Sequence, residues 1–467
     1  MSQAEPGRAK LRARLLRNAA SLLLVFATAT IRAEAQVQAE SPPHFEAPTV
    51  SDPLLAAPSP PARQIRSWDE ALALVRSRSP DYISGFESVL RAEAQSRIAL
   101  AAVLPTLTGQ GSYTHQFLTT SIPFGGRTIV APPPDLWAAG GTLAWPIVNP
   151  RGIYGIGTSK RSVEATKLSF SDRRREITTA VVNAMLSTLT AERVVDLTRV
   201  GLRSALERLA LAETRLKFGQ GTPLDVDRGQ QDVAAARAQL ITGDESLRQA
   251  REELGRALGS SIALGVPADL DLEQLERAVA RTCRLNDDLE RRPDVAAARK
   301  RVEVAERAIH DAELQLAPSL AVVSQAGYAT QATLGPRATW SLQGVVSWPL
   351  YDGGARYGAM RDARAASEQA RQALVSARLN AVISSARASR SVGVEQASRD
   401  VARSERDLAK RIDDRIRDAY ARGFGTSLDL VISAQALRQA DINLAVRDLQ
   451  LHEARANAVL ANAECLY

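Results

Sequence analysis

Side chains that could carry out chemistry are few in this chain, and they are scattered. The four histidines show no ligand spacing, so a metal site is not expected; they are His44, His115, His310 and His452. The pairs Gly125-Gly126 and Gly353-Gly354 lack the lysine and the helix context of a phosphate loop. No nucleophile motif occurs. The sequence therefore predicts neither an enzyme nor a cofactor-binding protein.

One acidic motif occurs twice. Gly221-Thr-Pro-Leu-Asp225 and Gly425-Thr-Ser-Leu-Asp429 lie 204 residues apart, each at the end of a long stretch without proline. A threonine at the helix cap with aspartate at the third helical position is the Asp form of a capping box. Such caps stabilise a helix by about 1 kcal/mol. Each aspartate is therefore expected to have at least a capping role.

The elements around these turns are arranged as a duplication. Pro80-Asp81 corresponds to Pro293-Asp294 and Trp145-Pro146 to Trp348-Pro349, in the same order and at nearly the same offset. An internal repeat of this kind indicates that the chain is built from two similar structural units. We expect a first repeat at 67–258, an equatorial segment at 259–292 without a counterpart, and a second repeat at 293–467. Each repeat holds a helix, a strand hairpin, a long helix, a tip turn and a returning helix.

The helices should dominate the fold. The first helix of each repeat is expected at 68–103 and 293–316, and the first long helix at about 156–217, roughly 90 Å at 1.5 Å per residue. Narrow apolar stripes follow coiled-coil spacing: Val195, Leu202, Leu206, Leu209 and Leu216 in one long helix, and Val394, Val401, Leu408, Ile412, Ile416 and Ala419 in the other. Asp407 with Arg411, and Asp413 with Arg417, are expected as surface ion pairs. Helices this thinly apolar need neighbours along their whole length.

A small β part is expected as one hairpin per repeat, at about 105–147 and 318–350, with a loop around Pro123 and Gly125. Polar and apolar residues alternate, and tryptophans lie near the strand ends: Trp137, Trp145, Trp340 and Trp348. This pattern fits both a membrane barrel strand and a hairpin of a soluble domain. Four strands cannot close a barrel in lipid without unpaired edges, so a membrane location requires several chains to share one barrel.

The N-terminus has the pattern of a secretory signal. A basic stretch precedes an apolar run at 19–31 and a small-x-small site, Ala33-Glu34-Ala35. We expect a signal peptide at 1–35 and a proline-rich linker without a core at 36–66. Removal of the signal leaves 53 basic and 50 acidic residues, so the net charge falls from +7 to +3. A nucleic-acid partner is therefore not expected.

Cys283 and Cys465 are the only cysteines. An exported chain meets oxidising conditions, in which a disulfide would persist. Both cysteines are expected near the equatorial segment, so a disulfide between them is one interpretation. The alternative is two unpaired thiols, which we favour because the sequence alone does not show that they approach each other.

The combined pattern resembles the TolC-like outer-membrane factor family. The similarity covers about 67–467, and its more specific marks are "RRPDVAAARKRVEVAERAIHDAELQLAPSL", "WPLYDGGAR" and "YARGFGTSLDL". The resemblance implies a homotrimer with a twelve-stranded β-barrel in outer-membrane lipid, continued by an α-helical tunnel in the periplasm. It further implies a passive exit duct of a tripartite efflux or type I secretion system, with a periplasmic adaptor and an inner-membrane pump as partners. The resemblance does not identify the transported molecule.

The resemblance also implies a role for the turns at 219–225 and 423–429. In the family, such tips close the periplasmic end, and an acid after each tip glycine (Gly219 and Gly423 here) faces the constriction. Asp225 and Asp429 match these acids, and Tyr420 matches a tyrosine of the closed state. Two positions depart: Ile432 stands where the family has an acid, and Gly425 where it has an arginine. Asp227 is a candidate substitute for the lost acidity. Capping alone remains the alternative role for both aspartates.

A rival of a different class is a periplasmic coiled-coil adaptor or scaffold without a pore. The strand segments discriminate between the two, because only a duct needs them in a membrane.

Overall fold

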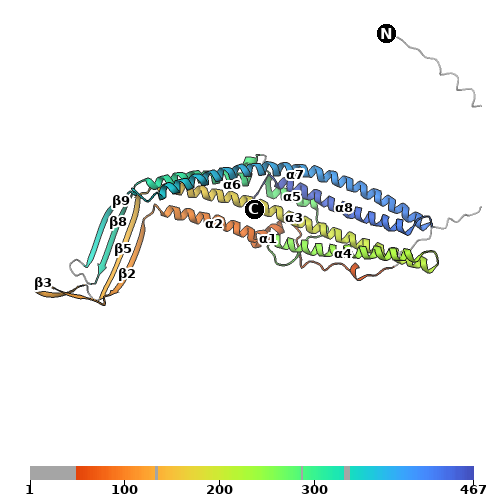
Figure 1. Cartoon of the computed structure of the whole chain (residues 1–467), viewed down its shortest axis with the longest axis horizontal. Helices are drawn as coiled ribbons and strands as arrows, with labels where there is room; N and C mark the ends of the chain where they lie inside the picture. Colours follow the sequence, from red (N-terminus) through yellow and green to blue (C-terminus); the bar gives the residue numbers. More distant parts are fainter. Residues whose placement is uncertain (1–48, 132–134, 286–287, 331–336) are drawn as a thin grey trace, which may run out of the picture. The chain divides into compact units, whose positions relative to one another are not determined.

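The computed structural model describes residues 49–131, 135–285, 288–330 and 337–467. The expected signal peptide and the first part of the expected linker lie outside these ranges. The described chain is mainly helical with one small four-stranded sheet (Figure 1), which confirms the expected fold class.

Two long helical hairpins form most of the structure. α3 (Pro150–Lys217) returns as α4 (Pro223–Ala257), and α7 (Ala355–Ala421) returns as α8 (Ser427–Leu460). α3 has 68 residues, so it is about 100 Å long. It begins before the expected position because Asn149 caps it, with Oδ1 accepting from Gly152 N at 3.0 Å. Among the residues described, no helix combines the length and apolar character needed to cross a membrane.

The first helix of each repeat is shorter than the long pair. The single helix expected at 68–103 is wrong, because the structure has α1 (Trp68–Arg78) and α2 (Pro80–Ala101). Ser79 is extended, with ψ of 117°, since a residue before proline avoids the helical region. The second repeat has α6 (Pro293–Glu313) followed by the short η3 (Leu314–Leu316).

Helix neighbours follow one order on each side of the equatorial segment. Towards the sheet, α2 packs on α3, α3 on α6 and α6 on α7. Towards the tip turns, α4 packs on α3, α3 on α8 and α8 on α7. Figure 1 shows this arrangement within residues 49–467. The first repeat thus has α2 and α4 at its outer edge, and the second has α7 at the opposite edge.

The four-stranded sheet is antiparallel with order β2-β5-β8-β9. Its strands are β2 (Thr106–His115), β5 (Asp135–Val148), β8 (Ser319–Ala329) and β9 (Ala338–Ser347). The central pair, β5 with β8, joins the two repeats. The expected loop between β2 and β5 contains a separate hairpin, β3 (Thr120–Phe124) with β4 (Arg127–Ala131), so that expectation was incomplete.

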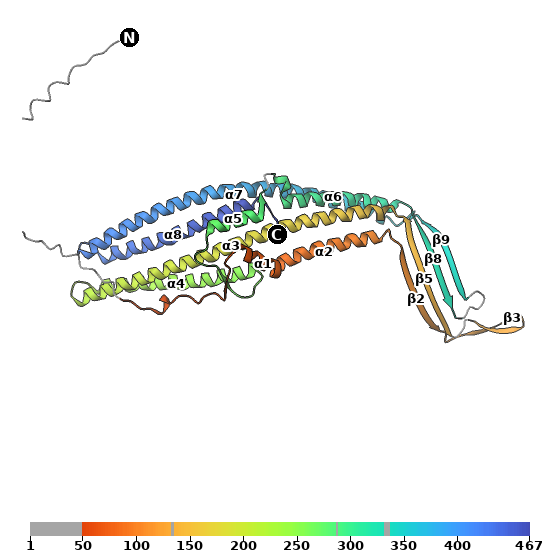
Figure 2. The ribbon, with the colours of Figure 1, turned by 180° about the vertical axis from the view of Figure 1, so that it is seen from behind.

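The largest hydrophobic core lies at the equatorial segment. Its short elements are β6 (Leu264–Gly265), α5 (Leu272–Thr282), β7 (Cys283–Leu285), η2 (Leu289–Arg291) and the C-terminal β10 (Ala463–Cys465). η2 packs on α6 and α7. The other elements pack with α1, the middle of α3 and the ends of α4 and α8; Figure 2 shows α1 and α5 in this region from behind. Ile65, Met185, Leu254 and Leu460 are fully buried there. This core fixes the two hairpins to one another at mid-length.

The expected linker at 36–66 is partly wrong, because residues 49–65 form an ordered N-terminal strap. It contains η1 (Pro53–Leu55) and β1 (Arg63–Gln64), which pairs in parallel with β6. Leu54 and Leu55 pack on the apolar cluster between α3 and α4. Asp52 forms an ion pair of 2.7 Å with Arg237 on α4. A proline-rich segment without a core of its own is therefore ordered by docking on the first hairpin.

The two expected apolar stripes differ in burial. In α3, Val195 and Leu202 are covered by α4. In α7, Val401 is 68% exposed, and Val394, Leu408 and Ile412 are exposed as well. No neighbour within the described chain covers this side of α7.

Both of the surface ion pairs expected on α7 are corrected, since Asp407 is not paired with Arg411 and Asp413 is buried. Arg417 does contact Asp413 at 2.7 Å, but Asp413 is fully buried, because Ser433 of α8 donates to it at 2.9 Å. Asp407 contacts its neighbour Arg406 at 3.4 Å. The Asp413 carboxylate is therefore part of the contact between α7 and α8 and does not form a surface pair.

Candidate functional site

Both long helices end in the same backbone motif at the tip turns, residues 219–225 and 423–429. Gly219 and Gly423 have φ of +72° and +83°, the left-handed conformation that glycine adopts without strain. Gln220 N donates to Arg215 O at 2.8 Å, and Phe424 N to Ala419 O at 2.9 Å. These are the six-to-one bonds of a Schellman motif, which satisfy the last carbonyls of a helix.

The second glycine of each turn is needed for a different reason. A Cβ on Gly221 would lie 3.1 Å from Leu216 N, and one on Gly425 would lie 3.0 Å from Tyr420 N. Both contacts are to backbone, which cannot rotate away. The arginine that the family resemblance led us to look for at position 425 would therefore require this turn to shift.

The returning helices begin with the predicted caps. Asp225 Oδ2 accepts from Thr222 N at 3.0 Å and from Thr222 Oγ1 at 2.9 Å. In the second turn, Thr426 Oγ1 accepts from Asp429 N at 3.1 Å. Each of these threonine–aspartate pairs lies across the first turn of its helix, where an acid also favours the helix dipole.

Asp225 has a further partner in the other repeat. Ser427 Oγ, at the start of α8, donates to Asp225 Oδ1. Arg228 Nη1, one turn along α4, donates to the same Ser427 oxygen at 3.2 Å. A buried serine hydroxyl thus links an acid and a base of the first tip to the second tip. We call Asp225, Arg228 and Ser427 the tip bridge.

A second contact between the tips involves Tyr420. The Arg215 guanidinium carbon lies 4.1 Å from the centre of the Tyr420 ring, within cation–π range. Arg215 Nη2 also donates to Tyr420 O at 3.2 Å. Tyr420 is buried by this contact. The tyrosine singled out from the sequence therefore joins the first repeat to the second within one chain.

The remaining predicted tip residues are solvent-facing. Asp429 and Asp227 are exposed, and the side chain of Ile432, at the position of the missing acid, is 55% exposed. The two repeat-related aspartates thus differ: Asp225 joins the tips, whereas Asp429 forms its bonds within its own cap.

The hydrogen bond from Ser427 is the main reason why the pKa of Asp225 is lowered from its ordinary 3.8. Partial burial opposes this, and the bonds from Thr222 and the charge of Arg228 add to the lowering. The ionised carboxylate is therefore the form that the tip bridge stabilises.

Arg215, Arg228 and Ser427 were not predicted. Ser427 occupies a helix position where serine is ordinary, and neither arginine has a counterpart in the other repeat. Their lack of repeat symmetry is the one signal in the sequence that could have drawn attention to them.

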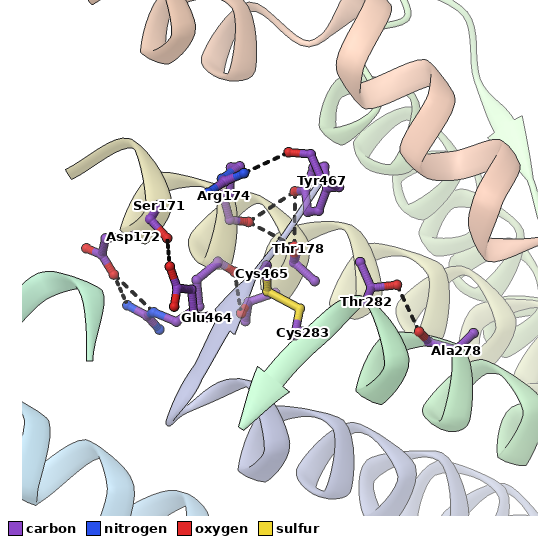
Figure 3. Close-up of a disulfide and its surroundings, with 12 residues drawn as sticks. Ser171, Asp172, Arg174, Thr178, Ala278, Thr282, Cys283, Glu464, Cys465 and Tyr467 are labelled. Carbon is purple, nitrogen blue, oxygen red and sulfur yellow. Dashed lines mark hydrogen bonds and ion pairs between the residues drawn. A yellow bond between two sulfur atoms is a disulfide. The ribbon is translucent and has the colours of Figure 1, made fainter. Parts of the chain in front are cut away.

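The two cysteines form a disulfide, which corrects the expectation of unpaired thiols. Cys283 on β7 and Cys465 on β10 are register partners, with an S–S distance of 2.03 Å. Figure 3 shows the surrounding contacts: Ser171 Oγ donates to Glu464 at 3.2 Å, and Arg174 Nη1 to Tyr467 O at 2.9 Å. The C-terminal segment is thereby fixed to α3 and to the equatorial core.

The predicted interface tryptophans share one face of the sheet. The strand register places Trp137, Trp145 and Trp340 on the same side, together with Leu107, Tyr113, Leu143, Tyr328, Leu342 and Val346. Trp348 follows β9 directly and donates from Nε1 to Leu316 O at 3.1 Å. The other face carries neutral polar side chains: Thr106, Thr108, Gln110, Ser112, Thr114, Thr142, Gln325, Thr339, Ser341 and Gln343.

The histidines lie apart in the described chain. His115 lies 2.7 Å from Asp135, His310 lies 2.9 Å from Glu313, and His452 lies 2.7 Å from Glu276; His44 lies outside the described residues. Within the described ranges, no group of three or more His, Cys, Asp or Glu residues could hold a metal ion.

Comparisons with known proteins agree on one family. A family model described as outer membrane efflux protein matches residues 72–260 and 285–461. The chain is 24% identical over 421 residues to the pyoverdine export outer membrane protein OpmQ of Pseudomonas putida, covering 85% of each chain. It is 25% identical over 303 residues to the fusaric acid resistance protein FusA of Burkholderia cepacia, covering 62% of this chain but only 56% of FusA.

Solved structures show the same fold. The Campylobacter jejuni CmeC outer membrane channel has a TM-score of 0.72 at 14% identity, over 84% of each chain. The outer membrane protein VceC of Vibrio cholerae has a TM-score of 0.67 at 17% identity, over 84% of this chain and 95% of VceC.

Proposed function

Because the chain belongs to the outer membrane efflux protein family, whose members are channels of the Gram-negative outer membrane and not enzymes, we propose that three copies of it form the exit duct of a tripartite pump. The rival expectation, an adaptor or scaffold without a pore, is wrong for a member of this family. The trimer, the position of the gate and the pump partners are the parts that we propose.

The open edges of the sheet are the observation that carries the trimer. β2 and β9 each lack a partner on one side within the described chain. In lipid, every unpaired backbone group costs several kcal/mol, so β9 of one copy must pair with β2 of the next until the ring closes. Two copies would give eight strands, whose interior side chains fill. Three copies give twelve strands, the smallest such ring that can enclose a passage.

The sheet also has the dimensions of a membrane strand. Trp137 and Trp145 lie eight residues apart on β5, as do Trp340 and Trp348 around β9. At about 3.4 Å per residue, each pair brackets roughly 27 Å of strand, about the length of a tilted strand that crosses a membrane. We therefore propose that the tryptophan face contacts lipid and that the neutral polar face lines the passage.

The helical edges support the same closure. α7 presents exposed apolar side chains along one side: Val375, Leu379, Val382, Ile383, Val394, Val401, Leu408 and Ile412. We call these the α7 stripe. At the opposite edge, α2 exposes Ile83, Phe86, Leu90 and Ile98. Contiguous apolar surface of this kind marks a protein–protein contact. β9 leads into α7, and α2 leads into β2. The contact between neighbouring copies would therefore continue from the edge strands of the sheet to the edge helices.

The tip turns lie at the end of the helices far from the sheet (Figure 1), so we propose that they form the periplasmic gate. Tyr420 and the tip bridge would hold it closed. A periplasmic adaptor and an inner-membrane pump are the proposed partners. OpmQ and FusA are named for pyoverdine export and fusaric acid resistance. We accordingly propose small organic molecules as the cargo, with secreted polypeptides as the alternative.

Cross-linking tests the trimer. Thr108→Cys on β2 is combined in turn with single cysteines at the polar positions of β9, in protein purified from outer membranes. We expect one register to give a covalent ladder that ends at three copies. A ladder that ends at two, or none at any register, would contradict the proposal. The same cysteines placed on β5 and β8, which are paired within one chain, should give no ladder and serve as the control.

A further inference from the structure

A buried charge lies deeper in the helices than the tip turns. Asp232 on α4 is 1% exposed, and Arg208 on α3 donates to its Oδ2 at 2.6 Å. Two donors come from α8: Arg438 Nη2 at 2.9 Å and Gln435 Nε2 at 3.2 Å, both to Oδ1. One carboxylate therefore joins both helices of the first hairpin to the second hairpin. We call Arg208, Asp232, Gln435 and Arg438 the Asp232 cluster.

The backbone of α3 is shaped to receive Arg438. A Cβ on Gly201 would overlap Cδ of Arg438 and would lie 3.1 Å from its Cγ. Arg438 Nη1 also donates to Gly201 O at 3.4 Å. Gly201 lies in the middle of α3, where glycine weakens a helix. The Arg438 side chain occupies the space that a Cβ would need, which gives a reason for a glycine at this position.

A second buried contact joins α7 to α8, so that the two helices would move together. Asp413 of α7 is fully buried and accepts from Ser433 of α8 at 2.9 Å, two residues before Gln435. Arg417 of α7 holds the same carboxylate at 2.7 Å. A displacement of Arg438 from Asp232 would therefore move the second hairpin as one unit.

The position of the cluster differs from that of the tip bridge. Asp232 lies ten residues beyond Thr222, about 15 Å along α4 at 1.5 Å per residue. Contacts of the tip bridge are partly exposed, whereas Asp232 and Arg438 are both at least nine-tenths buried. Separating a buried ion pair costs more than separating an exposed one. The two hairpins are therefore held together more firmly at this level than at their tips.

We infer that the Asp232 cluster positions the second hairpin against the first and keeps the duct closed at rest, with Arg438 as the residue that must leave its seat when the gate opens. This inference rests on the proposed function, since it requires a duct that closes at its tips. Arg438 is a positioning residue, which acts through the helices and does not touch the cargo.

Gly201→Ala tests the inference without removing a charge. The added methyl displaces Arg438, while alanine itself favours the helix. We expect the open probability in planar bilayers to increase at least about tenfold, and the thermal unfolding midpoint to fall, because the loss of the buried ion pair outweighs the gain in helix propensity. A merely structural role would lower the unfolding midpoint and leave the open probability unchanged. Gly393→Ala on α7, where a Cβ meets open space, is the matched control; it should leave the open probability unchanged and raise the midpoint slightly.

A second series removes the charge. Arg438→Met should open the channel, and Arg438→Lys should restore part of the closure, because lysine keeps the charge but not the two-atom fork. Asp448→Asn is the control: it breaks an ion pair of 2.9 Å with Arg399 inside the second hairpin. If the unmodified protein forms a channel but Gly201→Ala and Arg438→Met leave it closed, the inference is wrong and the proposed function stands. If the unmodified protein forms no channel at all, the proposed function itself is wrong.

Discussion

At the residue scale, Asp225 and Asp429 occupy equivalent positions in the two repeats but have different partners. Asp225 accepts from Ser427 of the opposite tip as well as from its own cap, whereas Asp429 bonds within its cap. The sequence could not separate these roles, because the difference depends on a residue 202 positions away. A capping contribution applies to both, and we propose a contribution to closure for Asp225, which contacts the opposite tip.

Single alanine variants should therefore give different results. We expect Asp225→Ala to raise channel conductance and to lower stability by about 1–2 kcal/mol, because a cap and a link between the tips are lost. Asp429→Ala should lower stability by about 1 kcal/mol and leave conductance unchanged. Planar-bilayer recordings and thermal unfolding of both variants would check this. Equal conductance changes in the two would contradict the assigned difference.

The lowered pKa of Asp225 predicts a pH dependence. A carboxylate whose pKa is lower in the folded state than its ordinary 3.8 contributes stability that is fully present above 3.8 and is lost as the pH falls through the folded value. We expect channel leakage to rise as the pH is lowered from about 5 to below 3.8, since protonation removes the charge to which Ser427 donates and which Arg228 attracts. Asp225→Asn should leak at both pH values, with a flatter profile. A wild-type profile without any rise would contradict this role.

The local features of the tips could be read from the sequence, and the contacts between them could not. The caps and the left-handed glycines follow from residue types within seven positions of each other. Arg215, Arg228 and Arg438 look like ordinary surface residues of a helix in the sequence, because arginine is a good helix former and is common on exposed faces. Their partners lie in the other repeat, so only the packing of α3 and α4 against α8 shows what they do.

At the element scale, the disulfide between β7 and β10 fixes the end of the second repeat to the equatorial segment. It closes a loop of 182 residues, and loops of this length gain most from a cross-link in the chain-entropy model. We expect Cys283→Ser with Cys465→Ser to lower the free energy of unfolding by about 2–5 kcal/mol. Thermal unfolding of the purified variant, with and without a thiol reductant, would measure this.

The control for that prediction is the reductant itself. It should lower the unfolding midpoint of the native protein towards that of the double serine variant and leave the variant unchanged. A native midpoint that stays constant after complete reduction, verified by thiol labelling, would show that the disulfide does not stabilise the fold.

Elements were predictable where they depend on their own sequence. The long helices follow from proline-free periodic stretches, and the sheet strands from alternation. The N-terminal strap was missed because proline-rich composition suggests a linker, while its order comes from Leu54, Leu55 and Asp52 docking on another element. The break at Ser79 was missed although Pro80 signals it, because the helical pattern continues on both sides.

At the scale of the whole molecule, the described chain has two open edges in its sheet. The same chain order that places β2 and β9 at the sheet edges places α2, α4 and α7 at the helical edges. Val195 and Leu202 of the first apolar stripe are covered by α4, whereas Val394, Val401, Leu408 and Ile412 of the second are exposed. The sequence predicted that both helices need neighbours. It could not tell that one neighbour lies within the chain, whereas the other would come from a further copy in the trimer that we propose.

The α7 stripe gives the prediction that belongs to this scale. Val401 is 68% exposed on the side of α7 that no described element covers. Val401→Asp should place a charge in the contact between copies, where desolvation without a partner is unfavourable. We expect the variant to fold, with unchanged helix content by circular dichroism, but to yield mostly monomers in detergent by light scattering. Val200→Asp on α3, 59% exposed but away from either edge, is the matched control and should stay trimeric. Monomers from both variants would point to a general effect of the charge, and trimers from both would show that α7 does not form the contact between copies.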